Sequence, residues 1–120
     1  MKRFYLQLPG REPTDITRMG SFILGRQGDL ILEGVGVSRR HCMISLPKNT
    51  DERTYICDGD GKIASRNGTK VNNKIFSCLP SNKLNKGCYL ANNDLITLGE
   101  VVIRYLEFQE EMSDDINATL

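Results

Sequence analysis

The chain has 120 residues, of which 39% are hydrophobic and 26% charged, and its formal net charge is +1 at pH 7. This length predicts one domain with its own hydrophobic core, and the composition is that of an ordinary globular protein. A membrane-spanning helix needs about 18 consecutive apolar residues. No such run occurs, and the opening MKRFYLQLPGRE lacks the apolar region of a secretory signal. We therefore expect a cytoplasmic protein that does not bind membranes.

The cysteines and the single histidine exclude the common zinc motifs. In a reducing compartment the default for Cys42, Cys57, Cys78 and Cys88 is a buried or half-buried thiol. No two of them are separated by two to four residues, and His41 is the only histidine. We expect no metal and no cofactor.

Charge is distributed unevenly along the chain. Residues 107–120 contain five acidic residues and no Lys or Arg, which leaves 16 basic against 10 acidic residues in the first 106. This modest positive excess favours the approach of a phosphorylated partner. It lacks the basic stripe of a duplex-binding protein and the interleaved aromatic residues of a single-strand binder. Nucleic acid is therefore not an expected partner.

Short apolar or alternating runs follow one another with almost no helical periodicity. In chain order they are RFYLQL (3–8), SFILG (21–25), LILEG (30–34), HCMISL (41–46), TYICD (54–58), DLITLG (94–99) and VVIRYLEF (101–108). Turn signals such as Pro-Gly, Asp-Gly and Asn-Gly separate them at intervals of roughly ten residues. Many short strands with such turns predict an all-β, antiparallel β-sandwich.

Three stretches of the chain have predictions of their own. In the first run, Phe4, Leu6 and Leu8 share one face, as a half-buried strand requires. Residues 77–90 are the longest irregular stretch and predict an excursion at one end of the fold. Residues 109–120 are charged and have little to bury, so we expect a disordered tail or a linker.

A glycine–arginine pair interrupts the run FILGRQGDLIL (22–32). Gly25 lets the backbone turn, and Arg26 presents five N–H donors in a planar fork that matches phosphate oxygens. Alone, the pair indicates only a solvated arginine at a loop edge.

The segment SRRHCMI (38–44) gathers polar residues where a strand begins. Ser38 can offer a hydroxyl to an anion, Arg39 a second cation, and His41 can brace the loop through its ring nitrogens. Singly, a turn serine, solvated arginines and a structural histidine explain the same residues. We expect no catalytic Ser–His pair, because His41 lies three residues after Ser38 on a segment that is predicted to be extended, with the two side chains on opposite faces.

In ASRNGTKVNN (64–73), Asn67-Gly68 lies between apolar runs and predicts a hairpin with a type I′ turn, in which both central residues have positive φ. The Asn67 amide, with one acceptor and two donors, could also hold a peptide backbone.

In their order and spacing, Gly-Arg, Ser-Arg-Arg-His, Ser-x-Asn-Gly-Thr and NDLITLG resemble the forkhead-associated (FHA) domain family. The resemblance runs over about residues 2–108. It implies a β-sandwich of about eleven strands, whose loops at one end bind phosphothreonine peptides. It also implies a domain over 1–108 followed by an acidic tail over 109–120.

The resemblance assigns roles by position. It implies that Arg26 and Ser38 bind the phosphate, that Arg39 is a second basic contact, and that Asn67 holds the main chain of the ligand. Three further residues are implied to shape the loops without touching the ligand: Gly25, His41 and Gly68.

The sequence departs from the family pattern near these positions. The link GDGKIA (59–64) is longer than is usual in the family, which allows the Ser65–Arg66 loop to be displaced. Arg66 stands where a small polar residue is common, so it could either contact the phosphate or partly occlude the site, and Ser65 is a further candidate contact. The family's frequent second Asn-Gly is Asn72-Asn73 here. The Gly-Val-Gly at 34–36 offers no side chain for selecting ligand residues downstream of the phosphothreonine.

These patterns favour a monomeric, non-catalytic module that binds a phosphothreonine-containing protein, the substrate of a Ser/Thr kinase. The alternative is a non-catalytic interaction domain of the same fold that binds an unphosphorylated partner through a sheet face or the 77–88 loop. A third hypothesis, a Ser- or Cys-dependent hydrolase, lacks a base at suitable spacing from any nucleophile.

Overall fold

A computed structural model describes residues 2–76 and 87–109. These residues form eleven β-strands and no helix. None of them lies in a helix of the length and hydrophobicity that crossing a bilayer requires. The predictions for residues 77–86 and 110–120 lie outside the described residues. The prediction that 77–90 is irregular is wrong at its end, because Gly87–Tyr89 forms a strand. The last strand ends at Gln109, one residue beyond the predicted domain boundary.

The strands form two sheets. One sheet has the order β2-β1-β11-β10-β7-β8 and the other the order β4-β3-β5-β6-β9. The first contains β2 (Thr14–Asp15), β1 (Lys2–Gln7), β11 (Val101–Gln109), β10 (Leu95–Leu98), β7 (Thr69–Val71) and β8 (Lys74–Phe76). The second contains β4 (Leu30–Ile31), β3 (Ser21–Gly25), β5 (Cys42–Ser45), β6 (Tyr55–Asp58) and β9 (Gly87–Tyr89). All the strand pairs described are antiparallel except β3 with β4, so the predicted β-sandwich is confirmed.

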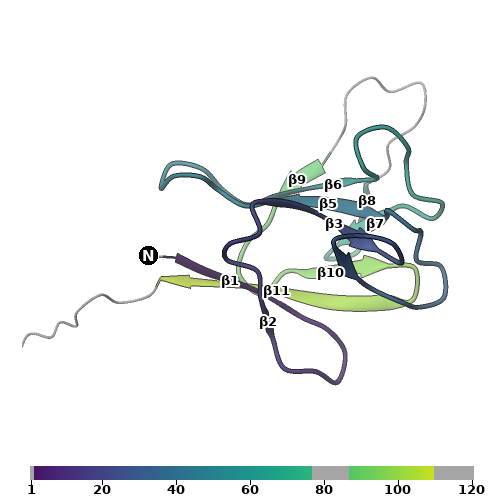
Figure 1. Cartoon of the computed structure of the whole chain (residues 1–120), viewed down its shortest axis with the longest axis horizontal. Helices are drawn as coiled ribbons and strands as arrows, with labels where there is room; N and C mark the ends of the chain where they lie inside the picture. Colours follow the sequence, from purple (N-terminus) through teal and green to yellow (C-terminus); the bar gives the residue numbers. More distant parts are fainter. Residues whose placement is uncertain (1, 77–86, 110–120) are drawn as a thin grey trace, which may run out of the picture.

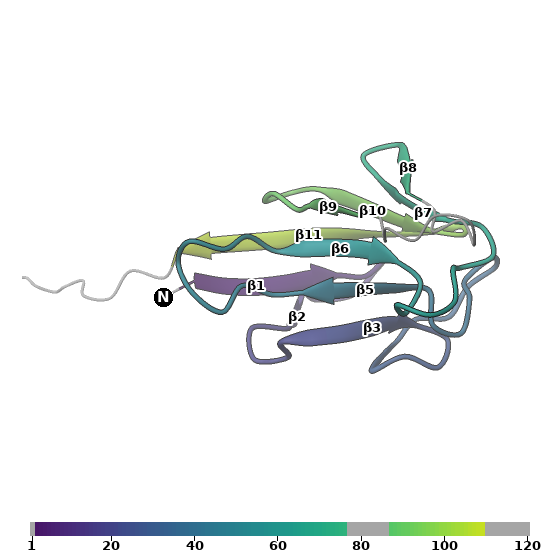
Figure 2. The same ribbon diagram turned by 90° about the horizontal axis from the view of Figure 1, so that it is seen from above.

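The two sheets pack face to face as two layers, which Figure 1 shows from the side. The N-terminus and the end of β11 lie at one end of the sandwich. The turns β3–β4 and β10–β11 and the loops β4–β5 and β6–β7 lie at the other end (Figure 2). The loops that carry the polar motifs therefore meet at one end of a rigid scaffold.

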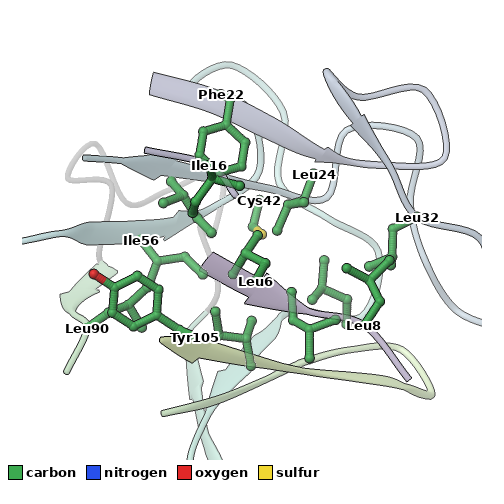
Figure 3. Packing of buried hydrophobic residues seen from close by; sticks show 14 of the residues in the cluster. Leu6, Leu8, Ile16, Phe22, Leu24, Leu32, Cys42, Ile56, Leu90 and Tyr105 are labelled. Atoms are coloured by element: carbon green, nitrogen blue, oxygen red, sulfur yellow. The ribbon is translucent and has the colours of Figure 1, made fainter. Parts of the chain in front are cut away.

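Inward-facing side chains of both sheets form one core (Figure 3). The predicted alternation in β1 is confirmed, because Phe4, Leu6 and Leu8 are all buried. In β5 and just beyond it, Cys42, Ile44 and Leu46 are buried as well. Burying an aliphatic or aromatic side chain stabilises a fold by about 1.5–3 kcal/mol, so the strand that follows the SRRH motif is firmly held.

A buried hydrogen bond also joins the two layers. The Tyr105 hydroxyl on β11 lies 2.6 Å from the Thr54 hydroxyl, which precedes β6 in the other sheet, and donates to Glu107 Oε1 at 2.6 Å. Burial is the main cause that raises the pKa of Tyr105 far above its ordinary value, and the Glu107 hydrogen bond adds to it. The phenol thus stays protonated and links the sheets.

One turn prediction is wrong. The hairpin between β7 and β8 turns at Asn72 and Asn73, whose φ values are 50° and 73°, so the type I′ turn lies there. Gly68 has φ 81°, but Asn67 does not have positive φ. The reason is that the Asn67-Gly68 backbone connects a loop to β7 and does not reverse between two paired strands.

Candidate functional site

The β3–β4 turn lies directly against the β4–β5 loop. The backbone N–H groups of Arg26 and Gln27 donate to the carbonyl oxygens of Ser38 at 3.1 Å and Arg39 at 2.8 Å. A Cβ atom at Gly25 would lie 2.2 Å from the Arg39 carbonyl oxygen. Glycine is therefore required for the close approach that brings the glycine–arginine and Ser-Arg-Arg-His motifs together.

Replacing Gly25 by alanine is expected to destabilise the protein by about 2–3 kcal/mol, because the added methyl group must push the Ser38–Arg39 backbone away. The control is Gly10→Ala, since Gly10 also has positive φ (68°) but its Cβ would meet nothing within 4 Å. It should cost only about 1 kcal/mol. Urea unfolding of both variants measures the difference, and equal losses would contradict the account.

The side chain of Arg26 is exposed, but a hydrogen bond fixes its orientation. Its Nε donates to the Val37 carbonyl oxygen at 2.7 Å. This bond fixes the plane of the guanidinium and leaves its two terminal amino groups with no partner among the described residues. A guanidinium held in this way can bind an oxyanion through both terminal groups.

His41 joins two loops and is completely buried. Its Nδ1 accepts the backbone N–H of Ser38 at 2.9 Å, so Nε2 carries the proton and donates to the Gly68 carbonyl oxygen at 2.8 Å. The prediction that residues 38–41 are extended, with the two side chains on opposite faces, is wrong. The chain turns at Arg39 and Arg40, which brings the ring back to the Ser38 backbone.

The Ser38 hydroxyl is bonded to the β6–β7 loop and not to His41. Its Oγ accepts the backbone N–H of Arg66 at 2.9 Å, which leaves the hydroxyl proton for a further acceptor. The longer link after β6 therefore does not displace the Ser65–Arg66 loop from Ser38. Close by, Asn67 Nδ2 donates to the Gly36 carbonyl oxygen at 3.1 Å. One N–H and the oxygen of this exposed amide have no partner within residues 2–76 and 87–109.

A buried carboxylate holds the β6–β7 loop from inside. Asp58 is completely buried, and its oxygens accept the backbone N–H of Ser65 at 3.0 Å, the Ser65 hydroxyl at 2.5 Å and the Thr69 hydroxyl at 2.7 Å. The Ser65 oxygen in turn accepts the Gly68 N–H at 2.8 Å. Ser65 is thus part of the loop framework, and its role as a further ligand contact stays a prediction. Gly68 takes part in the same framework through its N–H and its carbonyl oxygen.

A second aspartate orders the longer link itself. Asp60 Oδ1 accepts the N–H groups of Lys62 at 3.0 Å and Ile63 at 2.9 Å, and Oδ2 lies 3.0 Å from Arg40 Nε. The Ile63 and Lys62 hydrogen bonds, with a smaller contribution from Arg40, hold the pKa of Asp60 below its ordinary value. Asp60 engages Arg40, whereas the guanidinium groups of Arg39 and Arg66 have no partner among the described residues.

The site therefore gathers cations and neutral hydrogen-bond donors. Three exposed arginines adjoin Ser38: Arg39 is its neighbour in the chain, and Arg26 and Arg66 donate their backbone N–H groups to Ser38 oxygens. A hollow of about 320 Å³ lies beside Asn67, and Gly36, Lys70 and Thr97 contribute to its lining. Within residues 2–76 and 87–109, no three His, Cys, Asp or Glu side chains are grouped as a metal ion would require. Such an arrangement can hold an anion and an adjacent peptide.

Sequence reasoning missed Asp58 as the organiser of this end of the fold. Because Asp58 stands at the end of an apolar run, the sequence alone indicates only a turn residue there. The signal that could have identified it is the pair of hydroxyl residues seven and eleven positions later, Ser65 and Thr69.

A β-sandwich with polar, interlocked loops at one end is the architecture of a loop-based recognition domain. A model of the FHA domain family matches residues 17–99, so the chain belongs to the FHA domain family. The resemblance seen in the sequence motifs is thereby confirmed. No curated protein matches the sequence.

Solved structures agree with this family. The chain is 29% identical to an FHA domain from a structural and functional analysis of phosphothreonine-dependent FHA domain interactions, with a TM-score of 0.68 over 91% of this chain and 99% of that chain. It is 31% identical to the FhaA FHA domain, solved in complex with the intracellular domain of Rv3910, with a TM-score of 0.62 over 85% and 98%. The FHA domain of CT664 from Chlamydia trachomatis is 20% identical, with a TM-score of 0.68 over 89% and 99%, and shares the fold.

Proposed function

We propose that this chain is a non-catalytic module that binds phosphothreonine peptides through its β3–β4, β4–β5 and β6–β7 loops. Arg26 and Ser38 bind the phosphate, Arg39 and Arg66 add positive charge beside it, and Asn67 holds the main chain of the ligand. The partner is a protein that a Ser/Thr kinase has phosphorylated. The module acts as a monomer in the cytoplasm.

The observation that carries this proposal is the junction of two loops at Ser38. The Ser38 hydroxyl accepts the Arg66 N–H and keeps its own proton, while its backbone is fixed by His41 and by Arg26 N–H. A phosphate oxygen can take that proton while the terminal amino groups of Arg26 bind neighbouring oxygens. Since the donors are held before the ligand arrives, little ordering of the protein opposes binding.

The expected interaction energies are consistent with a module that binds phosphorylated peptides reversibly. A phosphothreonine carries about −1.5 to −2 charges at pH 7 and offers three acceptor oxygens. Hydrogen bonds to charged groups contribute about 1.5–3 kcal/mol each. Three or four of them contribute about 5–12 kcal/mol. After several kcal/mol for immobilising the peptide, the upper end of this range leaves room for a Kd of about 1 μM, or about −8 kcal/mol. Binding of the unphosphorylated peptide has the same entropic cost of immobilising the peptide. It lacks nearly all of the favourable hydrogen-bond energy.

Titration with matched peptides tests the proposal. Degenerate peptide pools that contain a fixed Thr, phosphoserine or phosphothreonine are added while binding is followed by fluorescence anisotropy. We expect binding of the phosphothreonine pool, weaker binding of the phosphoserine pool and none of the unmodified pool. Equal affinity for all three would eliminate the proposed function and favour recognition of an unphosphorylated partner.

The affinity is expected to fall by up to about tenfold between pH 7 and pH 5, because the phosphate takes up its second proton near pH 6. Asp60 has a lowered pKa, so its contribution is fully present above its ordinary value of 3.8 and is lost only as the pH falls through the lowered pKa. The Asp60 hydrogen bonds that order the link after β6 should therefore stay intact over this range. Far-ultraviolet circular dichroism at each pH provides the control, and a pH-independent affinity would contradict dianion recognition.

A further inference from the structure

The outward face of the β1-containing sheet carries an unusual set of side chains. The strand registers pair Arg3 with Phe108, Tyr5 with Leu106, and Gln7 with Arg104 across β1 and β11. Alternation places these side chains on the face opposite to the buried Phe4, Leu6, Ile103 and Tyr105. The outward face is thus defined by the pairing itself.

The neighbouring strands complete this face. Register pairs Leu95 with Arg104 and Thr97 with Val102 between β10 and β11, and Thr97 with Lys70 between β10 and β7. On the other side, β2 places Asp15 opposite Tyr5. Five of these outward residues are apolar or aromatic, and we call them the outer patch: Tyr5, Leu95, Val102, Leu106 and Phe108.

An antiparallel sheet with one solvent-facing side normally alternates apolar-inward and polar-outward residues. The outer patch departs from that pattern, since Phe108 is 53% and Val102 43% exposed. The Tyr5 and Phe108 rings stack with centroids 5.4 Å apart and an interplanar angle of 8°. The other three residues, Tyr5, Leu95 and Leu106, are half-buried. A partly exposed apolar patch marks an interaction surface more often than a single exposed apolar residue does.

The dimensions of the outer patch fit a helix. From Val102 to Phe108 a strand rises about 20 Å, and the three strands β1, β11 and β10 are about 10 Å wide. A helix of about 14 residues is about 21 Å long and 10–12 Å across with its side chains. A single amphipathic helix laid along β11 would cover the whole patch.

The charged residues around the outer patch indicate which net charge a bound helix should carry. Arg3, Arg104 and Lys70 lie on the outward face, whereas Asp15 is the only acidic residue among the outward positions assigned above. Asp15 is paired with Arg3 at 3.1 Å, so the net positive charge of these positions comes from Arg104 and Lys70. An acidic helix is therefore attracted to this face, and a basic helix is repelled.

We propose that the outer patch is a second docking surface, which binds an acidic amphipathic helix of a partner protein without requiring phosphorylation. The outer patch lies on β1, β10 and β11, whereas Thr97 and Lys70 at the edge of this face also line the hollow beside Asn67. The proposal does not depend on the phosphate site, and either can be correct without the other.

The experiment uses a designed probe because the partner is unidentified. A 14-residue lactam-stapled peptide carries Leu on one helical face and Glu on the other. One control peptide has the same composition scrambled to remove the apolar face, and another has Lys in place of Glu. Each is added to the ¹⁵N-labelled protein, and amide chemical shifts report where and how tightly it binds.

We expect shift changes on β1, β10 and β11, with a Kd of about 10–100 μM for the Glu peptide and at least tenfold weaker binding of both controls. Arg104→Glu should weaken binding of the Glu peptide about tenfold, and Val102→Ser about fivefold. Ile31→Ser is the matched control, since Ile31 is 60% exposed but lies on β4 of the other sheet. It should leave binding unchanged.

Three results would overturn the proposal. One is binding of the scrambled peptide as tight as that of the designed one, or no binding at about 1 mM. Another is a set of shifts confined to the loops at the other end. The third is a concentration-dependent dimer, seen by sedimentation and lost on Phe108→Ser, which would assign the patch to a second copy of the chain. Shift mapping on the unmodified protein decides the question even if a variant fails to fold.

Discussion

Replacing Asp58 by alanine is expected to lower the free energy of unfolding by about 3 kcal/mol or more. The substitution leaves the buried N–H of Ser65 and the hydroxyls of Ser65 and Thr69 without their acceptor, and unpaired buried donors cost about 1–3 kcal/mol each. For a domain of this size the melting temperature should fall by roughly 15 °C. Because the same loop brings Arg66 N–H to Ser38, phosphopeptide affinity should fall as well.

Two variants control this measurement. Thr69→Val keeps the shape of the side chain but removes one hydroxyl, so it should cost only about 1 kcal/mol. Asp51→Ala removes an exposed carboxylate that has no partner among the described residues, and its effect should lie within about 0.5 kcal/mol. If Asp58→Ala were as mild as Asp51→Ala, the buried carboxylate could not be the organiser of the β6–β7 loop.

Arg26→Ala is expected to abolish phosphopeptide binding, with a loss of at least about 100-fold, while leaving stability nearly unchanged. The loss follows from removing a bidentate, charge-assisted contact. Stability should fall by less than about 1 kcal/mol, because the side chain is exposed and its one described bond is to the Val37 carbonyl oxygen. Anisotropy titration and thermal unfolding of the same preparation separate the two effects.

Arg26→Lys distinguishes charge from geometry. It retains the positive charge but not the planar fork, so the affinity should be intermediate, about tenfold weaker than in the unmodified protein. Arg18→Ala removes an exposed arginine near the β2–β3 connection and should change neither property. A large loss of stability in Arg26→Ala with binding retained would instead mark Arg26 as a structural residue.

Much of the fold could be predicted because burial leaves a clear trace in the sequence. The alternation Phe4-x-Leu6-x-Leu8 predicted an inward face, and the spacing of turn residues predicted short antiparallel strands. Each of these depends on neighbours within a few residues, so the sequence contains the necessary information.

The loops could be predicted less well because their geometry is set by partners far along the chain. Asn67-Gly68 has the local signature of a type I′ turn, but Asn67 is fixed by the Gly36 carbonyl oxygen 31 residues earlier. His41 was expected on an extended segment, but the turn between it and Ser38 brings its ring to the Ser38 N–H. The importance of Asp58 depends on residues 7 and 11 positions later. These contacts span too many residues for a pattern of immediate neighbours to predict them.

The most direct test of the account is a crystal structure with a phosphothreonine peptide selected from the degenerate pool. The account predicts that one phosphate group lies within hydrogen-bond distance of both the Arg26 guanidinium and the Ser38 hydroxyl, with the Asn67 amide on the peptide main chain. A peptide bound elsewhere, or a phosphate that contacts neither Arg26 nor Ser38, would contradict it.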